Sequence, residues 1–255
     1  MAEAARAVAD ALRAGGRLLY VGAGTSGRLG VLDASECPPT FGTPPSQVQA
    51  AIAGGRRALT RAVEGAEDDK AAGAQAVRRF RAGPRDVVCG ISASATTPYV
   101  LAALAEARRR GARTVLVCCN PPGPRTRVDT VILAVTGPEV VAGSTRLKAG
   151  TATKLILNAL TTAAFVSLGK VYRGRMVDLR PANAKLQARA VRMVAELTEL
   201  PLAKARRLLS AAGGSVKVAL AMHFTGLSRE EALEQLQRTS LRALEQKKSR
   251  PRRTP

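Results

Sequence analysis

Short apolar runs alternate along the first half of the chain with stretches whose apolar residues recur at helical spacing. The runs are nearly all apolar, as in strands that are covered on both faces, and they lie at Arg17–Val21, Val48–Ala53, Asp86–Ile91, Thr114–Cys118 and Thr130–Val135. Helical patterns separate them at Arg28–Glu36, at Arg57–Arg81 with a break near Gly65, and at Pro98–Arg110. This alternation predicts an α/β fold, a doubly wound parallel five-stranded sheet with right-handed crossovers.

The second half of the chain reads as helical. A long helix is expected from Thr145 to about Leu168, followed by a loop, VYRGRMVDLRPANA, rich in turn residues. Beyond Asn183 short helices follow, and Ser228 with Glu231 forms a capping box for one of them. The expected organisation is a sheet domain over residues 1–185, a small C-terminal helical appendage over 186–246, and a basic disordered tail over 247–255.

Composition and net charge limit the kind of core and the kind of partner to expect. The 255 residues, 46% of them hydrophobic, suffice for one sizeable core, and with no Trp that core must be aliphatic. The net charge of +21 raises a nucleic-acid hypothesis. However, the basic residues are scattered along helical faces and no basic stretch is interleaved with aromatics, so bases would have nothing to stack on. We therefore expect no nucleic-acid partner, and an anionic small-molecule substrate instead.

Cysteine usage and the chain ends predict a location. Cys37, Cys89, Cys118 and Cys119 form no metal-ligand spacing, and the single His223 cannot complete a zinc site. Buried free thiols in a reducing compartment, and no metal, are therefore expected. The start of the chain is an amphipathic Ala-rich helix, which is unlike a signal peptide, and no apolar run is long enough to cross a membrane. We expect a cytoplasmic protein with no membrane partner.

A glycine-rich turn, VGAGTSGRLG at residues 21–30, follows the first predicted strand and opens a helix. Its glycines match the dinucleotide fingerprint, but that site needs an acidic residue at the end of the second strand, which here ends in glycines. What remains is a turn in which Gly24, Thr25 and Ser26 present N–H groups and hydroxyls to an anion. This indicates a phosphate cradle; the alternative is a tight turn that simply needs glycine.

A second turn, GISASATTPYV at residues 90–100, follows the third predicted strand. Ser92, Ser94, Thr96 and Thr97 crowd it, and Pro98 suits a first helical turn. Such hydroxyls also serve as plain helix caps. Because open α/β sheets bind ligands at the carboxyl ends of their strands, two hydroxyl-rich turns there favour one phosphorylated ligand.

Acidic residues are scarce, so their positions are informative. Glu36 lies in DASECPPT, and Glu64 and Glu67 lie in AVEGAEDD. Paired carboxylates can perform acid–base chemistry where histidine is missing, although AVEGAEDD also fits a solvated helix start.

The segment at residues 136–158, TGPEVVAGSTRLKAGTATKLILN, opens the long helix. Ser144 and Thr145 are expected to cap it, and Arg146, Lys148 and Lys154 could orient anionic groups. The alternative is a capped helix with a basic flank.

The resemblance to a known family is carried by the glycine-rich turn with DASECPPT, by AVEGAEDD, by the segment that opens the long helix, and by CNPPGP and KVYRGRMVDLRPANAKL. Together they resemble N-acetylmuramic acid 6-phosphate etherases over about residues 10–245. The glucokinase regulatory protein is a more distant relative. The resemblance implies a sugar-isomerase (SIS) fold, a homodimer, no cofactor, and cleavage of the D-lactyl ether of the substrate in peptidoglycan recycling. The implied products, N-acetylglucosamine 6-phosphate and D-lactate, form by elimination and hydration.

The resemblance also implies roles for single residues. Glu36 corresponds to the proton donor and Glu67 to the base, while Ser26, Ser92, Ser94 and Thr97 match sugar-phosphate-binding turns. In this family the third-strand turn usually reads ASGRTPYV, whereas here Ala95 and Thr96 replace the Gly-Arg pair. The family also usually opens with a segment that this chain is expected to lack.

Two other interpretations fit parts of the sequence. A non-catalytic sugar-phosphate sensor that regulates a partner protein would not need both glutamates. An SIS transcription regulator would need a DNA-binding domain before the sheet, where few residues are available.

Overall fold

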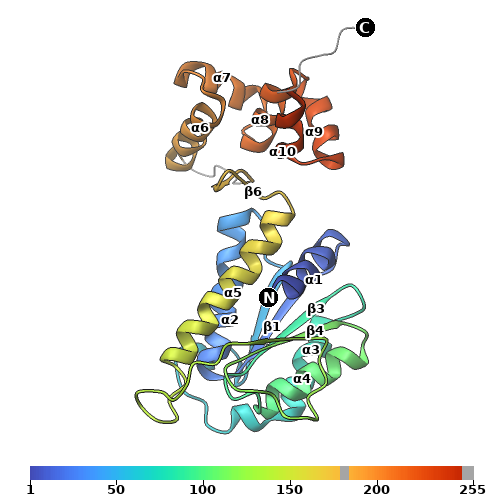
Figure 1. Ribbon diagram of the computed structural model, residues 1–255, viewed down its shortest axis with the longest axis vertical. Helices are drawn as coiled ribbons and strands as arrows, with labels where there is room; N and C mark the ends of the chain where they lie inside the picture. Colours follow the sequence, from blue (N-terminus) through green and yellow to red (C-terminus); the bar gives the residue numbers. More distant parts are fainter. Residues whose placement is uncertain (179–183, 249–255) are drawn as a thin grey trace. The chain divides into compact units, whose positions relative to one another are not determined.

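The structure is a computed structural model that describes residues 1–178 and 184–248. These residues form two compact units. The first comprises Met1–Pro38 and Thr43–Ala164, and the second comprises Pro39–Gly42 and the chain from Phe165 onward. Figure 1 shows the sheet and its helices in the first unit and the small helices from α6 onward in the second.

The first unit is built on one parallel sheet with strand order β2-β1-β3-β4-β5. The strands are β1 (Leu18–Gly22), β2 (Val48–Ile52), β3 (Val87–Ile91), β4 (Arg113–Cys118) and β5 (Thr130–Leu133). The predicted five-stranded parallel α/β fold is therefore confirmed, with strand ends shifted by one or two residues. Every residue of β1 and β3 is buried, which is why both read as continuous apolar runs.

Helices flank the sheet and complete its core. They are α1 (Ala2–Arg13), α2 (Gly24–Phe41), α3 (Lys70–Phe80), α4 (Pro98–Arg109) and α5 (Lys148–Ser167), with short 3₁₀ turns η1 (Gly55–Leu59) and η2 (Ala66–Asp68). Leu19, Val88 and Leu116 pack with residues of α3 and α4 in one cluster. On the α2 side, a Cβ added at Gly30 would lie 3.0 Å from the Tyr20 Cβ, so α2 lies directly against β1.

Two helices differ from the sequence-based prediction. α2 extends beyond Arg28–Glu36 at both ends, from Gly24 to Phe41. The helix expected over Arg57–Arg81 begins only at Lys70, after Gly65 adopts a left-handed φ of 71°. The Asp69 side chain then accepts a hydrogen bond from the Ala72 N–H at 2.8 Å and caps α3.

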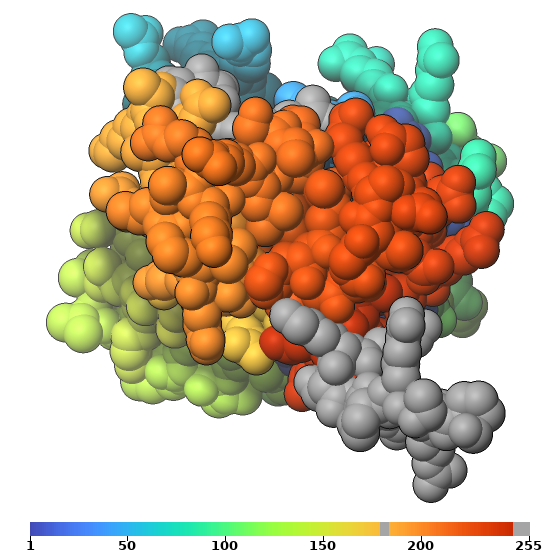
Figure 2. Space-filling model, turned by 90° about the horizontal axis from the view of Figure 1, so that it is seen from above, coloured from blue at the N-terminus to red at the C-terminus, as the bar shows by residue number. Residues whose placement is uncertain are grey.

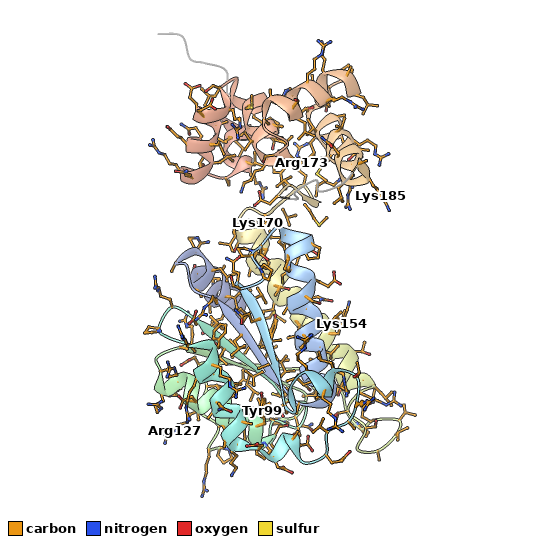
Figure 3. All side chains as sticks on the ribbon, turned by 180° about the vertical axis from the view of Figure 1, so that it is seen from behind. Tyr99, Arg127, Lys154, Lys170, Arg173 and Lys185 are labelled. Carbon is orange, nitrogen blue, oxygen red and sulfur yellow. The ribbon has the colours of Figure 1, made fainter. Side chains whose placement is uncertain are left out.

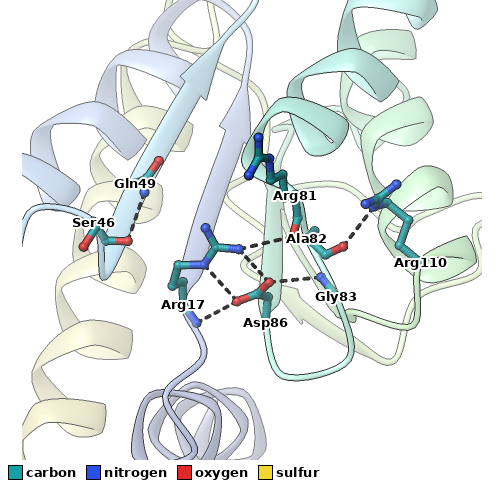
Figure 4. A network of polar contacts seen from close by, with 8 residues as sticks. All are labelled: Arg17, Ser46, Gln49, Arg81, Ala82, Gly83, Asp86 and Arg110. Carbon is teal, nitrogen blue, oxygen red and sulfur yellow. Dashed lines mark hydrogen bonds and ion pairs between the residues drawn. The ribbon is translucent and has the colours of Figure 1, made fainter.

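A polar network ties the amino ends of β1 and β3 together (Figure 4). The Asp86 carboxylate accepts hydrogen bonds from the Arg17 N–H at 2.9 Å, from the Arg17 guanidinium at 3.0 and 3.2 Å, and from the Gly83 N–H at 3.0 Å. Asp86 is only 6% exposed. The network lies at the edge of the sheet where β1 and β3 begin, so it stabilises the fold without touching the glycine-rich turn.

Replacing Asp86 by Ala is expected to lower the free energy of unfolding by about 3 kcal/mol, because it leaves the partly buried Arg17 and Gly83 donors without their acceptor. Urea unfolding monitored by circular dichroism measures this loss. Asp10→Ala is the control, because its pair with Arg13 is exposed and is expected to contribute less than about 1 kcal/mol. Equal midpoints for the two variants would contradict the prediction.

The second unit consists of a short antiparallel pair and small helices. The pair is β6 (Val171–Tyr172) with β7 (Arg175–Met176), and the helices are α6 (Ala184–Thr198), α7 (Leu202–Ala211), α8 (Val216–Thr225), α9 (Arg229–Arg238) and α10 (Leu241–Lys248). Val194, Leu220 and Leu244 lie at the centre of its core. The orange and red atoms in Figure 2 show that these helices form a continuous surface.

The predicted capping box of α9 is confirmed, since the Ser228 hydroxyl and the Glu231 carboxylate each accept a hydrogen bond from the other residue's backbone N–H. The loop expected after Gly169 contains the β6–β7 pair, and its last part, 179–183, lies outside the described residues. The expected tail also lies outside them, apart from 247 and 248, which end α10. Among the described residues, none of the helices combines the length and hydropathy needed to cross a bilayer.

Candidate active site

The glycine-rich turn joins β1 to α2 at the carboxyl edge of the sheet. Two of its glycines are required by packing: a Cβ at Gly22 would lie 2.6 Å from the Gly27 nitrogen, and one at Gly27 would lie 2.6 Å from Ile52 Cγ1. Gly24 is different, because it has a φ of +50° and nothing within 4 Å of its Cβ position. The Gly24–Ser26 segment is therefore open to a ligand, while the flanking glycines keep α2 against the sheet.

The hydroxyl-rich turn after β3 is held by its own side chains. Ser92 is 2% exposed, and its Oγ lies 2.8 Å from Thr97 Oγ1. The Thr96 hydroxyl donates to Ser94 Oγ at 2.8 Å, and the Thr96 N–H donates to the same oxygen at 3.2 Å. Ser94 and Thr96 are exposed, so this turn presents hydroxyls to solvent around a buried serine.

Ala95 gives this turn its shape. Its φ of 60° is in the left-handed region that favours glycine, and its side chain is 1% exposed. Its N–H donates to the Ser92 carbonyl at 3.0 Å, which closes the turn. Glycine, the residue usual here in the resembling sequences, would adopt this conformation without strain.

Ala95→Val is expected to lower the free energy of unfolding by about 3 kcal/mol, because a β-branched residue is strained at this φ and its extra methyl groups would have to enter a buried position. Ala95→Gly is the matched variant, with an expected change within about 1 kcal/mol, since relief of strain offsets the lost methyl burial. Thermal and urea unfolding measure both. Similar losses for Val and Gly would show that backbone strain is not what limits this position.

The two turns are neighbours, because β1 and β3 are adjacent strands whose last residues, Gly22 and Ile91, are register partners. Adjacent strands lie about 4.8 Å apart, so one small ligand can reach both turns. The start of α5 joins them: a Cβ at Gly150 would lie 3.5 Å from Thr25 Cγ2. Three helix N-termini, those of α2, α4 and α5, thus follow this edge of the sheet.

The N-terminus of α5 is capped by a residue that the sequence interpretation did not select. The Glu139 carboxylate accepts hydrogen bonds from the Lys148 N–H at 2.9 Å and from the Ala149 N–H at 3.0 Å. These bonds, that from Ala149 foremost, lower the pKa of Glu139. The cap expected from Ser144 and Thr145 is therefore wrong, and α5 begins at Lys148. Glu139 precedes the helix by nine positions, too far for a capping pattern to reveal it.

Ser144 and the basic residues named with it lie around this helix start. The Ser144 N–H donates to the Val141 carbonyl at 3.0 Å within a turn, and Arg146, Lys148 and Lys154 are exposed. Figure 3 labels Lys154 on α5 and Tyr99 at the start of α4. The exposed cations give the edge a positive potential that suits an anionic ligand.

Glu67 belongs to η2, which follows the carboxyl end of β2. It is exposed, and its neighbour Ala66 packs against the cluster that contains Ala53 and Ala95. A cavity of about 870 Å³ opens beside this segment, and residues that line it include Ile52, Gly54, Glu64, Gly65, Asp69 and Tyr99. The lining includes neither Glu67 nor the two turns, and it is the packing of Ala66 near Ala95 that places Glu67 at the same edge of the sheet as the turns.

Glu36 lies elsewhere in the same copy of the chain. It is exposed on α2, twelve positions after Gly24. At 1.5 Å per residue this separates the two Cα atoms by about 18 Å along the helix axis, more than the length of one sugar phosphate. One copy of the chain thus brings together both turns and Glu67, but not Glu36.

The cysteines lie in the interior of the fold. All four are free and buried. Burial, with the nearby Asp33 and Glu36 carboxylates, raises the pKa of Cys37 to about 12, so its thiolate is scarce near neutral pH. The described residues also contain no group of three or more side chains suited to hold a metal ion.

Comparison with known proteins decides the family. N-acetylmuramic acid 6-phosphate etherases from Gloeobacter violaceus and Synechocystis sp. are 59% and 54% identical to this chain, over 88% and 93% of it and 74% and 78% of their own lengths. This chain belongs to the N-acetylmuramic acid 6-phosphate etherase family. The etherase from Klebsiella aerogenes is 52% identical over 91% of this chain and 78% of its own length.

Two more distant comparisons bear on the fold. Residues 1–108 match the family described as the glucokinase regulatory protein N-terminal SIS domain. A phosphoheptose isomerase from Francisella tularensis has the same fold, with a TM-score of 0.51 and 22% identity over 65% of this chain and 84% of its own. The predicted resemblance to the etherases and to the regulatory protein is therefore confirmed.

Proposed function

We propose that this chain cleaves the D-lactyl ether of N-acetylmuramic acid 6-phosphate and releases D-lactate and N-acetylglucosamine 6-phosphate in peptidoglycan recycling. The observation that carries the proposal is its identity of 50% or more to etherases over most of its length. The two open turns at one edge of the sheet support it, because they offer N–H groups and hydroxyls to a sugar phosphate.

In the proposed site the phosphate binds to Gly24–Ser26, and the hydroxyls of Ser94 and Thr97 contact the sugar. Ser92 supports Thr97 through their 2.8 Å hydrogen bond. Ser144 lies in the loop that precedes α5 and is proposed to border the site. The positive charge of the chain, +21, favours binding of the phosphorylated sugar.

The proposed reaction requires one base and one acid. In the open-chain form of the sugar the C2 hydrogen is acidic because it is next to the C1 aldehyde, and Glu67 removes it. The C3–O bond then breaks while Glu36 protonates the departing lactate oxygen. Water adds at C3 of the unsaturated intermediate, so the balance is one water consumed, with no redox change and no cofactor.

We further propose that the site is completed by a second copy of the chain. Glu36 is separated from the turns of its own copy by about 18 Å along α2, and it lies on an exposed surface with apolar residues. On α2 and α5 these include Leu32, 45% exposed, and Leu155, 61% exposed. A two-fold axis across α2, midway between Gly24 and Glu36, would bring Glu36 of the partner subunit to the turns. A homodimer of this kind buries the apolar surface and assembles two sites.

A second candidate function follows from the match of residues 1–108 to the regulatory-protein SIS domain. Such a protein would bind the sugar phosphate and use it to control a partner protein, with no need for Glu36 or Glu67.

We also propose that the protein works in the cytoplasm, where the four free thiols would stay reduced.

Incubation of the purified protein with N-acetylmuramic acid 6-phosphate tests the proposal. We expect release of D-lactate, measured with D-lactate dehydrogenase, and stoichiometric N-acetylglucosamine 6-phosphate. N-acetylmuramic acid without the phosphate is the control substrate and is expected to react poorly. Binding of the phosphorylated sugar without D-lactate release would favour the regulator over the enzyme.

A further inference from the structure

A buried carboxylate holds α2 against the rest of the first unit. Asp33 on α2 is 4% exposed. Its carboxylate accepts hydrogen bonds from the Tyr20 hydroxyl at 2.9 Å, from Asn158 Nδ2 at 2.9 Å and from Thr161 Oγ1 at 3.3 Å. Tyr20 is on β1, and the other two donors are on α5. One side chain therefore fixes α2 to two other elements at once.

This arrangement is costly if it serves stability alone. All three donors are neutral, and within the described residues Asp33 forms no ion pair that would offset the desolvation of its charge. An apolar residue packed between Tyr20 and α5 would hold the helix at less cost. What the carboxylate adds is direction. The hydrogen bonds from Tyr20 and Asn158 define the rotation of α2 and its position along its axis, and the Thr161 hydroxyl is shared with the Leu157 carbonyl, 3.1 Å away.

Of the proposed site residues on α2, Glu36 is the one closest to Asp33 in the sequence. It follows Asp33 by three positions, so the two are on neighbouring turns of the same helix. Within the part of the chain that the structure describes, the Glu36 carboxylate forms no hydrogen bond or ion pair of its own. Its location is therefore set by the α2 backbone, which Asp33 fixes on this part of the helix, whereas Gly22 and Gly27 fix the first turn.

We infer that Asp33 is a positioning residue for the proton donor Glu36. This inference rests on the proposed function, and in particular on the division of roles between Glu36 and Glu67. Glu67 lies on η2, to which none of the four residues of the Asp33 network belongs. Gly24–Ser26 begin the same helix, but the close contacts of Gly22 and Gly27 hold that turn against the sheet. Loss of the network should therefore impair protonation of the leaving lactate and spare substrate binding and removal of the C2 proton.

Asp33→Asn tests the inference with two readouts. In deuterated water, C2 proton exchange followed by NMR reports on Glu67, and D-lactate release reports on both glutamates. We expect D-lactate release to fall by about 10- to 100-fold, as for a misplaced catalytic group, with KM and C2 exchange within about twofold of the unmodified chain. A merely structural role would lower both rates together, which would overturn the inference, as would unchanged D-lactate release.

Matched variants keep the test decisive. Asp33→Asn combined with Asn158→Asp exchanges the carboxylate and the amide, retains a hydrogen bond between α2 and α5, and is expected to restore D-lactate release to within about fivefold. Asp86→Asn is the control, because Asp86 is equally buried but lies at the opposite edge of the sheet. It is expected to lower stability and leave the ratio of the two rates unchanged.

If Asp33→Asn does not fold, Tyr20→Phe removes one donor from the same carboxylate and is measured instead. The same change in the ratio of the two rates is expected, and an unchanged ratio would overturn the inference. An unmodified chain that releases no D-lactate would contradict the proposed function itself, so the two failures are distinguishable.

Discussion

Glu67→Gln is expected to lower D-lactate release and C2 proton exchange together, each by about 10³-fold, because a carboxamide cannot accept the C2 proton and both processes require its removal. Coupled D-lactate assays and NMR in deuterated water measure the two rates. Glu64→Gln is the matched control, since it changes a neighbouring exposed glutamate of the same segment. Retention of C2 exchange in Glu67→Gln would show that another group is the base.

Glu36→Gln is the complementary variant. It is expected to reduce D-lactate release by about 10²- to 10⁴-fold and to leave C2 exchange largely intact, because the acid acts only when the C3–O bond breaks. Glu3→Gln changes an exposed glutamate outside the proposed site and should affect neither rate. Parallel loss of both rates in Glu36→Gln would contradict the separate roles.

Two inactive variants are expected to recover activity when they form a mixed dimer. Co-expression of Glu36→Gln and Glu67→Gln chains with different tags, followed by two affinity steps, yields dimers with one chain of each kind. If Glu36 acts in the partner's site, one site of each mixed dimer carries both changes and the other carries none. About half of the unmodified activity per dimer is therefore expected.

The same mixed dimer tests the alternative that both glutamates of a site come from one chain. With that arrangement each site would carry one change, and the mixed dimer would remain inactive. Tagged dimers of unmodified chains control for the purification, and sedimentation measures the oligomeric state. A monomer with full activity would contradict the composite site, even if the etherase activity were confirmed.

Much of the fold followed from local sequence pattern. The buried strands β1 and β3 are apolar on both faces, so their short runs were recognisable without any other information. The start of α5 was not, because Glu139 caps it from a preceding loop and no rule of spacing joins them. β5 is shorter than the sequence predicts. It is an edge strand with alternating exposure, and it ends at Leu133, opposite the last residue of its partner strand, β4.

The candidate site was predictable in part, because the order of strands and helices along the chain determines which turns meet. The turns after β1 and β3 meet because parallel strands end at one edge, which the order of elements already required. The distance of Glu36 from those turns was not visible, because it depends on α2 beginning at Gly24 and continuing past Glu36 as one helix. Glu36 and Glu67 were paired by resemblance, and the sequence contained no sign that one copy keeps them apart.

The second unit takes in Pro39–Gly42, a segment that the ribosome makes long before the rest of that unit. Phe41 stacks on Phe165 with ring centroids 4.5 Å apart. During synthesis, more than a hundred further residues must therefore be added before Phe41, at the end of α2, can pack against Phe165. For the same reason, a fragment that begins at Phe165 would lack the Phe41 ring that stacks on its first residue, and a single cut at Phe165 does not separate the two units.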